Sequence, residues 1–117
     1  MLARDRRVRR SRDFERIWRT RHIYRHPALV LRVVRSTNGA GRAGFIVAKA
    51  TAKRAVDRNL LKRRLREIVR AHTLPSGTDL VFVAQRGALS ITFAELKHVV
   101  SSLLNQALAG PTRRARN

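Results

Sequence analysis

Hydrophobic positions recur at helical spacing near both ends and in the middle of this sequence. Near the N-terminus, Phe14, Ile17 and Trp18 stand at positions i, i+3 and i+4 of a pattern that runs from Ser11, a candidate N-cap, to about Thr20. Arginines occupy the opposite side of this segment. The spacing predicts a short amphipathic helix that packs its apolar side on a core.

Two longer helices are predicted further along the chain. One is capped by Thr51 and runs from Ala52 to about His72, because its apolar residues share one side: Leu61, Leu65, Ile68, Val69 and His72. The other opens with Thr92 and Glu95 at the spacing of a capping box, and we expect it to end before Gly110-Pro111.

Strand patterns separate these helices. β-branched and apolar residues favour strands over Ala28–Val34, Arg42–Lys49 and Asp79–Ala84. The turn residues at 38–41 predict that the first two strands form a hairpin, and His22–His26 is expected to be a loop.

The order helix–strand–strand–helix–strand–helix predicts an α+β fold, in which helices pack on one side of a small mixed β-sheet. A chain of 117 residues fits one domain, which we expect to span 1–117 with a basic arm at 1–10 and a flexible basic tail at 110–117.

Composition excludes several classes of protein. The chain has no cysteine, which excludes a disulfide framework, a Cys-ligated zinc and a Cys nucleophile. It has no apolar run of the roughly 18–20 residues that a membrane span needs, and no signal-peptide pattern at its basic N-terminus. We therefore expect a soluble cytoplasmic domain with no membrane partner.

Charge is the strongest signal, because Lys+Arg 27 against Asp+Glu 7 gives a net charge of +20. Residues 1–70 hold 22 of the cations and 5 of the carboxylates, whereas residues 71–111 are neutral overall. Self-repulsion of this size disfavours a compact chain unless a polyanion offsets it. Nucleic acid is the predicted partner, ahead of an anionic membrane surface.

The middle helix concentrates this charge on one face, which holds Asn59, Lys62, Arg63, Arg66 and Arg70. Arg58 lies between that face and the apolar one, and further cations surround them: Lys53, Arg54 and Arg64. A solvated helix face normally interleaves both signs. Here only Asp57 and Glu67 interrupt nine cations between positions 49 and 70, so the pattern favours a phosphate-binding ridge over a merely solvated face.

The aromatic pair Phe14 and Trp18 admits two interpretations. Aromatic faces beside arginines stack on unpaired bases, which suits a single strand. Residues at this spacing equally serve to anchor a helix to a sheet. The sequence alone does not choose between them.

Catalysis by the chain itself is not predicted. The seven carboxylates are scattered, so no converging set is available for a two-metal nuclease. The four histidines show no metal-ligand spacing, and no phosphate-binding glycine loop or serine nucleophile motif is present.

Two stretches resemble the protein subunit of bacterial ribonuclease P. Residues 42–49 (RAGFIVAK) fit the family pattern R-x-G-[LF]-x-V-x-K, and residues 58–67 (RNLLKRRLRE) match R-N-R-x-K-R-x-x-R-E at every specified position except the third, which is Leu60. The similarity extends to Arg12-Asp13-Phe14-Glu15 and to the strand at 79–84 with the helix after it, and so covers most of residues 4–108.

This resemblance implies a fold similar to domain two of a small-subunit ribosomal protein, with a left-handed β-α-β crossover. It also implies an activity, the removal of the 5′ leader from precursor tRNA, with Mg²⁺ and the cleavage belonging to the RNA subunit. The protein would bind no cofactor, metal or small-molecule substrate of its own.

By position, the resemblance assigns two sets of residues. Contacts with the ribonuclease P RNA are expected from the motif positions Arg58, Asn59, Lys62, Arg63 and Arg66. The neighbouring cations Lys53, Arg54 and Arg70 are expected to add to them because they surround the same helix face. Contacts with the single-stranded leader are expected from Arg12, Phe14, Trp18 and Lys49. The chain departs from the family where Leu60 replaces an arginine and where Ala50 replaces a lysine, and each change removes a cation.

Two other classes of function remain open at this point. A ribosomal or other structural RNA-binding protein would carry the same charge without processing tRNA. A double-stranded DNA-binding module would place a helix in the major groove, where the aromatic pair has no use.

Overall fold

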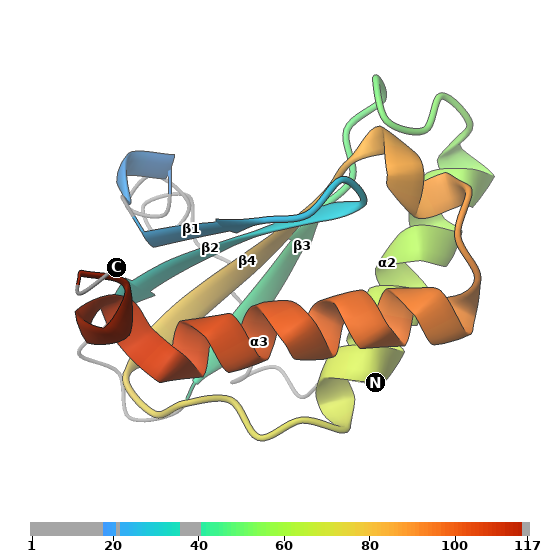
Figure 1. Cartoon of the computed structure of the whole chain (residues 1–117). Coiled ribbons are helices and arrows are strands. Elements are labelled where there is room, and N and C mark those ends of the chain that lie inside the picture. Colours follow the sequence, from blue (N-terminus) through green and yellow to red (C-terminus); the bar gives the residue numbers. More distant parts are fainter. Residues whose placement is uncertain (1–17, 21, 36–40, 116–117) are drawn as a thin grey trace.

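A computed structural model describes residues 18–20, 22–35 and 41–115, with side chains as far as Leu108 (Figure 1). Its elements are, in chain order, β1 (His22–Arg25), β2 (Leu29–Arg35), β3 (Arg42–Ile46), α2 (Ala55–Arg70), β4 (Thr78–Ala84), the 3₁₀ helix η2 (Arg86–Leu89) and α3 (Phe93–Ala115). Trp18 and Arg19 are helical, as predicted for the end of the first helix, whose other residues lie outside the described part.

The four strands form one mixed sheet in the order β1-β2-β4-β3. β2 pairs antiparallel with both β1 and β4, whereas β3 runs parallel to β4, with α2 between them in the chain. The predicted α+β class, with a small mixed sheet and helices packed on it, is confirmed.

The predicted hairpin between β2 and β3 is wrong, because β4 lies between these strands. Leu80, Val81 and Phe82 are fully buried, on both faces of β4, and a strand of that kind belongs in the middle of a sheet. The hairpin partner of β2 is instead β1, which the sequence analysis expected to be a loop. His26 and Leu29 exchange two backbone hydrogen bonds, of 2.9 and 3.1 Å, at the turn that joins them.

One face of the sheet carries the core. Directly paired positions put Tyr24, Leu31 and Phe82 on this face, and Phe45 stacks on Phe82 at a centroid distance of 5.7 Å. Both α2 and α3 contribute buried residues to the same cluster. Figure 1 shows α3 lying across the sheet, and α3 contacts β1 and β2 whereas α2 contacts β3.

Two helix boundaries differ from the prediction. Thr51 caps no helix, because α2 begins only at Ala55 after Arg54, and the Thr51 hydroxyl bonds to the backbone of β4 instead. α3 continues to Ala115 through Gly110-Pro111, so the predicted end before these two residues is wrong.

The capping box at the start of α3 is confirmed. The Thr92 N–H donates to Glu95 Oε1 at 2.8 Å, and the Glu95 N–H donates to the Thr92 hydroxyl at 3.1 Å. The bond from the Thr92 backbone, with a further contribution from its side chain, lowers the pKa of Glu95. This carboxylate is therefore ionised at neutral pH and structural, and it is unsuited to act as a general acid.

Gly41 marks a close approach of two backbone segments just before β3. A Cβ at this position would lie 2.6 Å from the Pro75 carbonyl oxygen and 2.7 Å from the Leu74 Cβ. We expect Gly41→Ala to lower the free energy of unfolding by ~1–3 kcal/mol, measured by urea denaturation, because neither neighbour is a flexible side-chain end. Gly87→Ala is the matched control, because a Cβ at position 87 would lie 3.2 Å from its nearest neighbour, the Pro27 carbonyl oxygen. This variant should lose less of the free energy of unfolding. Equal stabilities of both variants would contradict this account.

Candidate nucleic-acid interface

The outer face of α2 carries the predicted row of polar and cationic side chains. Asn59, Arg63 and Arg70 are exposed, and Lys62 and Arg66 are half-buried. The opposite side of the helix is buried as predicted, through Leu61, Leu65, Ile68 and Val69. α2 thus packs one side on the core and presents the other to solvent.

Few carboxylates compensate these charges. Within the described residues, the ion pairs are Arg42–Asp79 and Arg70–Glu67. In the second pair, Arg70 Nη2 lies 3.4 Å from Glu67 Oε1, and both side chains are about half exposed. An ion pair this exposed contributes little to the free energy of folding. Lys62, Arg63 and Arg66 lie in neither pair. A surface of like charges that lack partners is stabilised by a bound polyanion.

The loop that precedes α2 adds three exposed cations: Lys49, Lys53 and Arg54. Arg58, which the resemblance assigned to an RNA contact, has partners within the protein. Its Nη1 donates to the carbonyl oxygens of Ala52 and Lys53 at 2.9 and 2.8 Å. The structure therefore brings the loop and the first turns of α2 together into one cationic surface.

Trp18 lies at a second surface, beside β2. Its side chain is 48% exposed, so it is not a core residue. The Arg32 guanidinium lies over the indole ring at 4.6 Å from the ring centroid, and Arg32 Nη1 donates to the Trp18 carbonyl at 3.4 Å. Of the other predicted leader contacts, Arg12 and Phe14 lie outside the described residues, and Lys49 is in the loop before α2.

The contact of Arg32 with Trp18 was not predicted from the sequence. The neighbours Leu31 and Val33 face the core, so strand alternation turns Arg32 to the other face of the sheet, opposite Ile23 and Val81 in the register. The sequence did carry a signal for it, because Arg32 is the one charged residue in the apolar segment Ala28–Val34. The Trp18–Arg32 pair offers an aromatic face and a cation together, as a stacking platform for a base requires.

The Trp18 surface and the cationic surface of α2 lie toward opposite edges of the sheet. Trp18 contacts β2, next to the β1 edge, whereas α2 packs against β3 at the opposite edge (Figure 1). This separation allows one chain to contact two different segments of nucleic acid.

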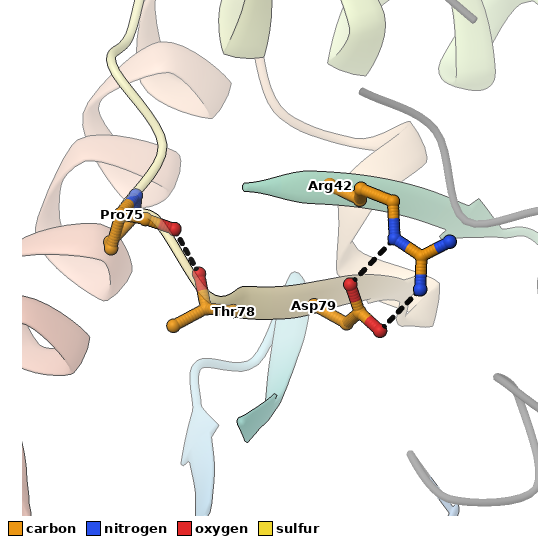
Figure 2. Close-up of polar contacts among 4 residues, drawn as sticks. All are labelled: Arg42, Pro75, Thr78 and Asp79. Atoms are coloured by element: carbon orange, nitrogen blue, oxygen red, sulfur yellow. Dashed lines mark hydrogen bonds and ion pairs between the residues drawn. The ribbon is translucent and has the colours of Figure 1, made fainter. Parts of the chain in front are cut away.

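A bidentate ion pair fixes the strand that leads to the cationic surface. Arg42 Nε and Nη2 donate to the two Asp79 carboxylate oxygens at 2.8 and 2.7 Å, between directly paired positions of β3 and β4 (Figure 2). Beside it, the Thr78 hydroxyl donates to the Pro75 carbonyl at 2.6 Å. Asp79 is fully buried, so its role is structural.

No metal centre is found among the residues that the structure describes, since none of their His, Asp and Glu side chains gather in groups of three or more that suit an ion. In the same part of the chain, no helix has the length and hydropathy of a membrane span.

Comparison with known proteins decides among the classes left open above. The family model described as Ribonuclease P matches residues 2–108. The chain belongs to the ribonuclease P protein family. It therefore has a role in ribonuclease P, a ribonucleoprotein of tRNA processing.

Relatives of this family match over most of their length. The ribonuclease P protein component of Herpetosiphon aurantiacus is 33% identical over 108 residues, which cover 91% of this chain and 87% of that protein. The component from Dehalococcoides mccartyi is 36% identical over 101 residues, covering 86% and 83%.

Solved structures of the family share the fold. The ribonuclease P protein of Staphylococcus aureus superposes with a TM-score of 0.77 at 25% identity, over 87% of this chain and 94% of that one. The protein of Thermotoga maritima gives a TM-score of 0.76 at 25% identity, over 86% and 96%.

Proposed function

We propose that this chain assists ribonuclease P in removing the 5′ leader of precursor tRNA, by binding both the catalytic RNA and the leader. The observation that carries the proposal is the outer face of α2, where Arg63 is exposed and Lys62 and Arg66 are half-buried, all three without carboxylate partners among the described residues. Phosphate oxygens are the ligands that such a face suits.

Within this proposal, each surface has its own RNA segment. The loop before α2 and the outer face of α2 bind the ribonuclease P RNA, through Lys53, Arg54 and the α2 cations. Trp18 and Arg32 bind the single-stranded leader, with Arg12, Phe14 and Lys49 as further contacts. Cleavage is carried out by the RNA subunit with its Mg²⁺, in the cytoplasm, and the protein supplies affinity and position.

Reconstitution tests the proposal. A ribonuclease P RNA transcript and a precursor tRNA are combined at low Mg²⁺, with and without the protein, and leader release is followed on a gel. We expect cleavage to depend on the protein under these conditions, and the protein alone to release no leader. Leader release by the protein alone that persists through further purification would overturn the assignment of catalysis to RNA.

Salt dependence tests the α2 contacts. Each phosphate contact adds roughly 0.7–0.9 to the slope of log affinity against log salt concentration. The double variant Arg63→Ala/Arg66→Ala should therefore flatten this slope for ribonuclease P RNA by about 1–2 units. Circular dichroism should show an intact fold, because both side chains lie outside the buried seam of α2. An unchanged slope would move the RNA-binding surface elsewhere.

A further inference from the structure

We infer that Arg58 and Thr51 are positioning residues, which hold the loop at residues 47–54 in the shape that presents Lys53 and Arg54 to the ribonuclease P RNA. This inference rests on the proposed function. It changes the role of Arg58, which the resemblance treats as an RNA contact in its own right.

Arg58 reaches back from the first turn of α2 to the loop. Its Nη1 carries two hydrogens and bonds two successive carbonyl oxygens, those of Ala52 and Lys53, at 2.9 and 2.8 Å. Both donors of this nitrogen are therefore used within the protein. The positive charge of the guanidinium strengthens its hydrogen bonds to these carbonyl oxygens, just before the helix begins at Ala55. A side chain held in this way fixes the direction of the backbone at position 53.

Thr51 holds the same loop from the other side. Its hydroxyl donates to the carbonyl oxygen of Ala84, the last residue of β4, at 3.2 Å. The backbone of the loop turns on itself at this point, because the N–H groups of Thr51 and Ala52 both donate to the Ala48 carbonyl, at 3.0 and 3.1 Å. The loop is thus tied to the central strand of the sheet as well as to α2.

The loop has a buried side and a charged side. Val47 and Ala52 are 7% and 2% exposed and belong to a small core cluster with Ala84 and Leu61. The three cations of the loop are exposed. Because buried and exposed positions alternate closely here, a change in the path of the loop would move the cations relative to the outer face of α2. A loop already fixed before binding avoids the entropy cost of ordering it on the RNA.

Variants that keep the net charge separate positioning from direct contact. Thr51→Val removes the hydroxyl but no charge, and Thr51→Ser keeps the hydroxyl. Arg58→Lys keeps the charge but replaces the planar guanidinium group by an ammonium group on a flexible alkyl chain, which lacks the fixed geometry of the guanidinium donors. Lys97→Arg is the matched control, because it exchanges the same two cation types at an exposed position of α3 outside the RNA-binding surface.

Two measurements are made on the full-length chain. Affinity for a ribonuclease P RNA transcript is measured over a series of salt concentrations, and amide hydrogen exchange is measured at Thr51 and Ala52 in the free protein. We expect Thr51→Val and Arg58→Lys each to lose up to about tenfold in affinity, the effect of one net hydrogen bond. In both variants the slope of log affinity against log salt concentration should become shallower by about 0.7–0.9, which is the contribution of one cation that no longer reaches a phosphate. Their loop amides should exchange faster, whereas Thr51→Ser and Lys97→Arg should match the wild type.

Each contrary result has a definite meaning. Wild-type affinity and slope in both Thr51→Val and Arg58→Lys would overturn the inference, as would unchanged exchange at both amides. Arg58 would be a direct phosphate contact if Arg58→Lys binds the ribonuclease P RNA as tightly as the wild type while Arg58→Ala shows a shallower dependence of affinity on salt concentration. Failure of the proposed function is distinct, because it appears as absence of RNA binding by the wild-type chain. Thermal midpoints confirm that each variant is folded at the temperature of the assay.

Discussion

Replacing Asp79 by asparagine is expected to lower the free energy of unfolding by ~3–5 kcal/mol, the cost of leaving one member of a buried ion pair without its opposite charge. Asp79 is fully buried, and the Arg42 side chain is only 15% exposed, so water cannot replace the lost carboxylate. Chemical denaturation in urea measures the change.

A double variant provides the control for this prediction. Arg42→Met combined with Asp79→Leu removes both charges together, and such replacements are often neutral in stability. It should therefore be clearly more stable than Asp79→Asn alone. If Asp79→Asn unfolds at the same urea concentration as the wild type, the pair does not secure the alignment of β3 on β4.

The position of this ion pair explains why its effect should reach the RNA-binding surface. Arg42 and Asp79 are direct neighbours at the start of the parallel pairing, and β3 leads from there into the loop and α2. A one-residue slip of β3 would turn its side chains to the opposite face of the sheet. The pair therefore fixes the register on which the placement of the cations depends.

Trp18→Ala is expected to weaken binding of precursor tRNA by ~1–3 kcal/mol, the contribution of one base stacked on an aromatic ring. Binding of mature tRNA should be nearly unchanged, because mature tRNA has no leader. Affinities for the two RNAs, measured side by side by filter binding, give the comparison. A short single-stranded leader should also quench the fluorescence of Trp18, the only tryptophan of the chain.

Stability distinguishes this role from a structural one. A fully buried tryptophan costs ~3–5 kcal/mol when truncated to alanine. Trp18 is 48% exposed, so its truncation should cost clearly less. Arg32→Ala is the companion variant, since it removes the cation over the ring and should likewise weaken binding of precursor tRNA more than binding of mature tRNA. A large loss of stability with equal effects on both RNAs would remove Trp18 and Arg32 from the leader surface.

Local features of the fold were predictable from the sequence. The buried seam of α2 followed from apolar residues at helical spacing, and the start of α3 followed from Thr92 and Glu95 three positions apart. The cationic outer face of α2 followed from the same spacing. These features depend on side chains within one or two turns of each other, so the order of residues is sufficient to fix them.

Only the tertiary structure decided which strands pair and what each site residue touches. The insertion of β4 between β2 and β3 depends on covering its two apolar faces, which local turn signals do not describe. The bonds of Arg58 to the loop, and the stacking of Arg32 on Trp18, likewise join residues that the folded backbone brings together. By itself, the sequence determined the presence of α2 and α3, though not all of their boundaries, the charged and apolar faces of α2, and the family motif. The structure determined strand order, exposure and side-chain partners, because these are set by contacts between distant segments that no local pattern encodes.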